Sequence, residues 1–136
     1  MTAEEPGIVL DASVAVRTLV SAGDRDRPLR ERVHAAACHA PHLLDAEVGN
    51  VLRRQVAIGA IEPDSARAAL RGLADLVTDR YPHTVVAQEA WALRHNLTYY
   101  DALHVALAAR LGYPLLTADA RLARSPELPC EVELID

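Results

Sequence analysis

Short apolar segments that alternate with longer helical patterns constrain the fold of this chain more than any other feature. The run 7–11 is apolar until it stops at Asp11, and the run 114–117 has a second pattern typical of a buried strand. The segment 130–135 alternates like a final strand, and 39–42 is a brief extended link, short enough to be an edge or minor strand. This alternation predicts an α/β domain around a mostly parallel sheet.

Helical patterns with recognisable start and stop signals fill the rest of the chain. Pro63 suits the first turn of a helix, and Gly59 and Gly112 suit the ends of the helices before them. Because no repeat, low-complexity stretch or linker interrupts the pattern, we expect a single domain over residues 1–136. The helices are expected at 13–20, 24–38, 43–58, 63–77, 84–95 and 99–111, with a single helical turn at 119–123.

Charge and composition exclude several classes of protein. The formal net charge of −5 argues against a general polyanion binder, and all 14 basic residues are arginine. No apolar run reaches the roughly 18 residues that cross a bilayer. The segment Met1–Pro6 is acidic where a secretory signal would be basic. Cys38 and Cys130 are isolated, so we expect reduced thiols in a cytoplasmic protein that has no membrane contact.

Two aspartates follow the two strands that the pattern predicts most clearly. Asp11 ends the first strand, and Asp119 comes just after the strand 114–117. Ligands of open α/β sheets bind outside the carboxyl ends of the strands, so both positions favour chemistry. The alternative is that both residues only cap helices, because aspartate is a common N-cap.

Two further acids lie on the apolar faces of predicted helices. Glu47 shares a face with Leu44 and Val51, where a carboxylate is unfavourable unless it is paired or bound to a metal. Asp101 lies four residues before Val105, on the buried face at the start of its helix. The alternatives are that Glu47 reaches solvent from the edge of the stripe and that Asp101 opens its helix as a cap.

Together the four acids predict a cation site. Two carboxylates about 4 Å apart repel by roughly 4 kcal/mol at an effective dielectric near 20, so a cluster of them needs a divalent cation or bound protons. Ligand sets made only of oxygen favour Mg²⁺ or Mn²⁺ over zinc. The residue types therefore predict metal-assisted attack of water on a phosphoryl group.

These acids, in this order, resemble the PIN-domain family and in particular the VapC toxins of bacterial toxin–antitoxin pairs. The resemblance spans almost the whole chain; the short DxS and TxD pieces are unspecific, whereas the ordered set with the YDA segment is specific. It is carried by Ile8-Val-Leu-Asp-Ala-Ser13, Pro41-His-Leu-Leu-Asp-Ala-Glu-Val-Gly-Asn-Val-Leu52, Tyr100-Asp-Ala-Leu-His-Val-Ala-Leu-Ala108 and Leu115-Leu-Thr-Ala-Asp-Ala-Arg-Leu122.

The resemblance implies a PIN-like α/β/α sandwich with a central parallel sheet and an endoribonuclease that depends on Mg²⁺ or Mn²⁺. The four acids of the family fall on Asp11, Glu47, Asp101 and Asp119. By the same resemblance Asp11 and Asp101 bind the metal directly, while Glu47 and Asp119 hold metal-bound waters or a second ion. The hydroxyl positions of the family, which brace the carboxylates or a water, match Ser13 and Thr117.

The resemblance also implies partners. A cognate VapB-like antitoxin would wrap the chain, a homodimer is typical of the family, and DNA would be reached only through the antitoxin. The expected substrate is a structured RNA such as a tRNA or an rRNA loop. The alternative function is a catalytically inactive PIN-fold binding module, since a fold does not fix an activity.

Other enzyme classes fit the sequence less well. A receiver domain and a P-loop enzyme both need a lysine, which the chain lacks. A haloacid-dehalogenase-like phosphatase needs a second acid two residues after the first, where this chain has Ser13.

Histidine and arginine residues near the acids remain ambiguous at this level. We expect His104 to be a packed or hydrogen-bonded neighbour of the site rather than a metal ligand, because Mg²⁺ prefers oxygen. The other five histidines show no ligand spacing and are expected at the surface or as caps. Arginines over 25–32 form either an RNA-binding stretch or a solvated face balanced by acids, and Arg17 is the one nearest the first motif.

Overall fold

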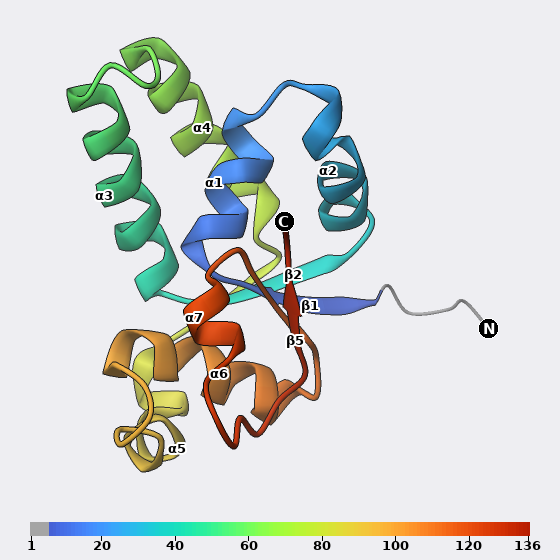
Figure 1. Cartoon of the computed structure of the whole chain (residues 1–136), viewed down its shortest axis with the longest axis vertical. Coiled ribbons are helices and arrows are strands. Elements are labelled where there is room, and N and C mark those ends of the chain that lie inside the picture. Colours follow the sequence, from blue (N-terminus) through green and yellow to red (C-terminus); the bar gives the residue numbers. More distant parts are fainter. Residues whose placement is uncertain (1–5) are drawn as a thin grey trace.

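The computed structural model describes residues 6–136 as a five-stranded sheet with helices on both of its faces (Figure 1). The segment 1–5, on which the prediction about a secretory signal depends, lies outside the described residues. Within 6–136, no helix combines the length and the apolar character needed to span a bilayer. The strands are β1 Gly7–Leu10, β2 Ala37–Pro41, β3 Asp79–Tyr81, β4 Leu115–Thr117 and β5 Val132–Leu134.

The sheet is parallel throughout, in the order β3-β2-β1-β4-β5. The chain builds outward from β1 to β3 on one side and then returns to add β4 and β5 on the other. The strand order therefore reverses between β1 and β4, and such a reversal opens a crevice at the carboxyl ends of the two strands. Leu10 pairs with Leu116 across this boundary, so Asp11 and Thr117 follow at the same level.

The helices form two layers. Figure 1 shows α1–α4 above the sheet and α5 and α6 below it, while α7 lies against β4 and β5. The α-helices are α1 Ala12–Val20, α2 Arg27–His34, α3 Leu43–Ala57, α4 Pro63–Leu76, α5 Ala87–Ala92, α6 Tyr99–Leu111 and α7 Ala120–Ala123, with short 3-10 turns at η1 Asp24–Asp26 and η2 His83–Val85.

Strand β1 is apolar at every position because both of its faces are covered. Ile8 and Leu10 pack with the residues of α1 and α2, whereas Val9 packs on the other face with α5 and α6. All four residues of the strand are buried. Buried parallel strands have such continuous apolar runs, so the placement of Asp11 at the end of one fixes the acid at the rim of the core.

The predicted helix over 24–38 is wrong in its last four residues, 35–38. A 3-10 turn and α2 occupy 24–34, and Ala37 already belongs to β2. The alanines at 35–37 favour a helix by propensity, but Gly7 of β1 pairs with Ala37 and Ile8 with Cys38. Tertiary pairing therefore overrides local propensity at this point.

Three further differences separate the structure from the sequence predictions. The extended link at 39–42 is not an edge, because β2 lies between β1 and β3 and spans 37–41. The sequence did not indicate β3 at all, since only three residues form it and two of them are charged. The helix predicted over 84–95 is also shorter, with a 3-10 turn followed by α5 at 87–92.

Candidate metal and active site

Asp11 is the most firmly held of the predicted site residues. It is 8% exposed at the carboxyl end of β1, and one carboxylate oxygen accepts the backbone N–H of Val14 (3.1 Å) and the hydroxyl of Ser13 (2.5 Å). The other oxygen accepts the hydroxyl of Thr117. Asp11 is therefore the N-cap of α1, which was the alternative interpretation of its position in the sequence. The capping bond to Val14 engages only one of its carboxylate oxygens.

Two hydroxyl groups join Asp11 to the segment that follows β4. The Ser13 hydroxyl donates to Asp11 and accepts the backbone N–H of Ala118 (2.9 Å). The Thr117 hydroxyl donates to Asp11 and accepts the backbone N–H of Asp119 (3.0 Å). Each hydroxyl thus bridges the end of β1 and the end of β4, which places both where the resemblance expects them. Their catalytic role remains a prediction.

Asp119 caps the short helix α7. Its carboxylate accepts the backbone N–H groups of Arg121 (2.9 Å) and Leu122 (3.3 Å). The Arg121 guanidinium lies 4.0 Å from the other carboxylate oxygen, and its side chain is 83% exposed. Asp119 is thus a helix cap, which was the alternative interpretation of its position in the sequence. The Thr117 hydroxyl, which contacts both residues, keeps the backbone of Asp119 near Asp11.

Asp101 lies in the first turn of α6, where Thr98 is the N-cap. The Thr98 hydroxyl accepts the backbone N–H of Asp101 at 3.2 Å, so Asp101 does not itself open the helix. Burial raises the pKa of the Asp101 carboxyl; the nearby His104 and the Thr98 hydrogen bond oppose this rise, and the negative charges of Asp119 and Glu47 add to it. Asp101 is therefore close enough to Asp119 and Glu47 to sense their charges.

Glu47 reaches the site from α3 and is held by His104 of α6. The Nε2 atom of His104 lies 2.7 Å from a carboxylate oxygen of Glu47. The histidine side chain is 2% exposed, whereas the glutamate side chain is 29% exposed. One end of the Glu47 carboxylate is thus anchored in the core, as expected of His104, while the residue keeps access to solvent.

The structure also tests the expectations for the remaining arginines and histidines. Arg17 pairs with Asp26 at 2.6 Å. Within the stretch 25–32, Arg27 and Arg32 pair with acids and Arg30 donates to a backbone carbonyl, so acids balance only part of this stretch. The expectation that the other histidines are surface residues or caps is wrong for His39, which is 8% exposed in β2, with Nδ1 2.9 Å from the Tyr81 hydroxyl. Only its contacts across β2 and β3 reveal this.

The structure links Asp11 to the Asp119 segment and places Asp101 within reach of the charges of Asp119 and Glu47, but it does not close the four acids into a cage. Within residues 6–136, no three Asp, Glu, His or Cys side chains are placed to hold one ion in this arrangement. Among these same residues, Asp11 and Asp101 have no basic partner within 4.0 Å. Oxygen donors whose negative charge is left uncompensated fit a hard divalent cation. Direct binding by Asp11 and Asp101 remains a prediction.

Comparison with known proteins points in one direction. The model of the PIN-domain family matches residues 8–128. The chain is 49% identical over 128 residues to ribonuclease VapC1 of Mycobacterium tuberculosis, covering 93% of this chain and 96% of that protein. It is 35% identical over 128 residues to a VapC ribonuclease of Mycobacterium bovis, covering 94% and 98% respectively.

Two solved structures share the fold. PAE2754 of Pyrobaculum aerophilum superposes with a TM-score of 0.61 at 26% identity, over 90% of this chain and 86% of that one. VapBC2 of Rickettsia felis, solved with a DNA fragment from its promoter, superposes with a TM-score of 0.66 at 13% identity, over 96% and 99%. These matches agree with the all-parallel sheet and its two helical layers.

Proposed function

The chain belongs to the PIN-domain family, within its VapC branch, and on this premise we propose that it is a divalent-metal-dependent endoribonuclease that acts as the toxin of a VapBC-type pair. The observation that carries the proposal is the arrangement of acids at the β1–β4 crevice. Asp11 is tied to the Asp119 segment through Thr117, and Asp101 senses the charges of Asp119 and Glu47.

In this proposal Asp11 and Asp101 hold Mg²⁺ or Mn²⁺, and Glu47 and Asp119 hold its waters or a second ion. When bound, such an ion neutralises phosphoryl charge and lowers the pKa of a water molecule. The chain's own residues supply the positioning. Ser13 and Thr117 fix the Asp11 carboxylate by donating hydrogen bonds to both of its oxygens. A carboxylate fixed in this way cannot turn away from the crevice between β1 and β4.

His104 has the corresponding role for Glu47. Its buried ring fixes one oxygen of Glu47 at 2.7 Å, and in this proposal the other oxygen holds a metal-bound water or a second ion. Thr98 similarly fixes the backbone of Asp101 at the start of α6. Preorganised carboxylates of this kind reduce the reorganisation that the reaction requires.

The proposal extends to partners and location. By similarity to the VapC relatives, we propose a structured RNA substrate such as a tRNA or an rRNA loop, a VapB-like antitoxin, a homodimer and a cytoplasmic location, with DNA reached only through the antitoxin. Residues 1–136 would then act as one PIN domain. The alternative, an inactive PIN-fold binding module, is disfavoured because all four acids are present and Asp101 senses the charges of Asp119 and Glu47.

RNA cleavage tests the proposed function. The purified chain should cut a structured RNA in Mg²⁺ or Mn²⁺, stop in excess EDTA and recover when the metal is restored. Asp11→Asn removes a charge without changing shape and should reduce cleavage by at least about a hundredfold, as losses of central catalytic groups do. The matched control Asp64→Asn, at an exposed position in the first turn of α4, should cut normally. Equal cleavage by Asp11→Asn, or full activity in EDTA, would overturn the proposal.

A further inference from the structure

Aromatic side chains are scarce in this chain, and most of them are exposed. It has one Trp, four Tyr and no Phe. Tyr81 and Tyr113 pack beside His39, but the other three aromatic residues lie at the surface. Trp91 is 57% exposed, Tyr99 39% and Tyr100 63%. Aromatic rings normally supply core packing, so three exposed rings among five indicate a use outside the core.

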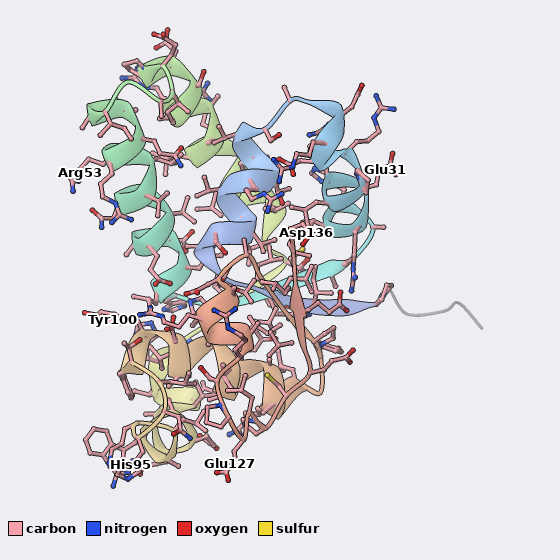
Figure 2. All side chains as sticks on the ribbon, in the orientation of Figure 1. Glu31, Arg53, His95, Tyr100, Glu127 and Asp136 are labelled. Carbon is pink, nitrogen blue, oxygen red and sulfur yellow. The ribbon has the colours of Figure 1, made fainter. Side chains whose placement is uncertain are left out.

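Two of these rings, Trp91 and Tyr99, line the same hollow, and the third, Tyr100, follows Tyr99 directly in α6. Tyr99 and Tyr100 form the first turn of α6 and directly precede Asp101. Trp91 comes from α5, which packs against α6, and it lines a hollow of about 440 Å³ together with Tyr99. Figure 2 labels Tyr100 at the start of α6, pointing away from the core. The Tyr99–Tyr100 end of this surface therefore adjoins Asp101, one of the two residues that we assign to metal binding.

A positive charge lies beside Trp91. The Arg94 guanidinium lies 4.8 Å from the centre of the Trp91 ring and donates to the Trp91 carbonyl at 3.1 Å. In the part of the chain that the structure describes, no carboxylate pairs with Arg94. Exposed rings with an unneutralised arginine suit a strand whose bases stack and whose phosphates need a cation.

We propose that Trp91, Tyr99 and Tyr100 form a stacking surface for the unpaired bases of a single-stranded RNA segment, with Arg94 beside its phosphates. The inference rests on the proposed function, because it places the substrate next to the same acids. In a duplex, the neighbouring base pairs cover the faces of each base, so the stacking surface favours loops and ends over helical RNA. It thereby selects the unpaired part of a folded RNA for the acidic site.

Trp91 reports on this surface directly, because it is the only tryptophan of the chain. A single-stranded RNA oligonucleotide titrated into the cleavage-deficient Asp11→Asn chain should quench Trp91 fluorescence. The same sequence annealed to its complement should bind more weakly and leave the emission nearly unchanged. Equal quenching by the duplex, or none by the single strand, would overturn the proposal.

Substitutions separate stacking from plain apolar contact. Tyr100→Ala and Tyr99→Ala should each weaken single-strand binding about tenfold, in the range measured for loss of one base stack. Tyr100→Phe keeps the ring and should bind within about threefold of the parent, and Trp91→Phe should bind better than Trp91→Leu. The matched control is Ile58→Ala, which removes an exposed apolar side chain just after the C-terminal end of α3 and should leave RNA binding unchanged.

Two further outcomes are decisive. If the rings form an interface between two copies of the chain, Trp91→Leu will change the sedimentation coefficient and RNA will leave Trp91 emission unaltered, which overturns the inference. In the parent with Asp11 intact, Tyr100→Ala should raise KM more than it lowers kcat. An unchanged KM would overturn the stacking surface and leave the nuclease assignment intact. If the parent cuts no RNA, the proposed function fails, and the fluorescence titration alone decides the inference.

Discussion

The fold disfavours the ionised form of the Asp101 carboxyl group. Burial is the largest cause of its raised pKa, and the charges of Asp119 and Glu47 act in the same direction. The pKa of this carboxyl is higher in the folded than in the unfolded chain. At a pH below its ordinary pKa of 3.8 the group is protonated in both states and does not destabilise the folded chain. The destabilisation appears as pH rises through the window between the unfolded and the folded pKa, and it is complete above that window.

Asp101→Asn should therefore stabilise the metal-free chain at neutral pH. The substitution removes a half-buried charge and keeps the shape, so we expect the free energy of unfolding to rise by about 0.5–2 kcal/mol, the usual gain from one stabilising substitution. Urea unfolding at pH 7 and at pH 4 measures the effect. The gain should be larger at pH 7, where the carboxyl of the parent is ionised.

Asp64→Asn is the matched control for this prediction. Asp64 is also in the first turn of a helix, but it is exposed and far along the chain from the acids. Its loss should lower stability slightly, because a negative charge near a helix N-terminus is favourable. Our account of Asp101 is wrong if both variants behave alike, or if the gain of Asp101→Asn is the same at both pH values.

The buried ring of His104 has one nitrogen with a partner and one without among the described residues. Its Nδ1 atom is buried and has no hydrogen-bond partner among the described residues, while Nε2 contacts Glu47. A neutral ring with its proton on Nε2 donates to Glu47 and leaves only an unpaired acceptor at Nδ1. Such an incompletely satisfied buried group is unfavourable for folding, and its contact with Glu47 supplies a functional reason for it.

Function and stability should therefore separate at His104. His104→Met fills the space without the polar atoms, so we expect the unfolding free energy to change by less than about 1 kcal/mol. RNA cleavage should fall by about 10–100-fold, the usual effect of losing a residue that orients a metal-site ligand. His104→Gln, whose amide can donate near the Nε2 position, should lose less activity. If Met and Gln variants cleave equally, the histidine only fills space.

Among the secondary-structure elements, those with strong local signals were predictable from sequence. The apolar run before Asp11 indicated β1, and Pro63 and Gly112 marked a helix start and a helix end where the structure has them. Gly112 has a φ of 73°, which residues with a side chain rarely adopt, so its role as a stop signal has a direct physical cause.

Elements that depend on distant pairing were not predictable. β3 consists of Asp79, Arg80 and Tyr81 and forms only because it pairs with β2. The same limit applies to the site. Residue type and order indicated the acids, but the bond of Glu47 to His104 joins positions that are distant along the chain. Similarly, the Ser13 contact with the Ala118 backbone is invisible before the strands are paired.

The N-cap of α6, Thr98, should contribute measurably to stability. Thr98→Ala removes the side chain that accepts the Asp101 backbone N–H, so the protein should lose about 1 kcal/mol of stability. Thr98→Ser keeps the acceptor and should preserve most of it. Thermal unfolding of the two variants provides the measurement. Equal stability of Ala and Ser at this position would show that the cap bond contributes little to the start of α6.

For the whole molecule, topology explains why acids far apart in sequence meet. The reversal of strand order places the ends of β1 and β4 side by side, and α3 and α6 approach this edge from opposite faces of the sheet. The fold thus gathers negative charge at one place in a chain that already carries a net charge of −5. An ion that binds only the folded state would stabilise it in proportion to the logarithm of its concentration.

Titration with Mn²⁺, followed calorimetrically or through the electron paramagnetic resonance signal of the free ion, tests this account most directly. We predict that the parent chain binds Mn²⁺, that Asp11→Asn and Asp101→Asn each weaken its affinity at least about tenfold, and that Asp64→Asn leaves it unchanged. If Asp101→Asn binds Mn²⁺ as tightly as the parent while Asp11→Asn does not, the two carboxylates do not share an ion, and the proposed site is contradicted.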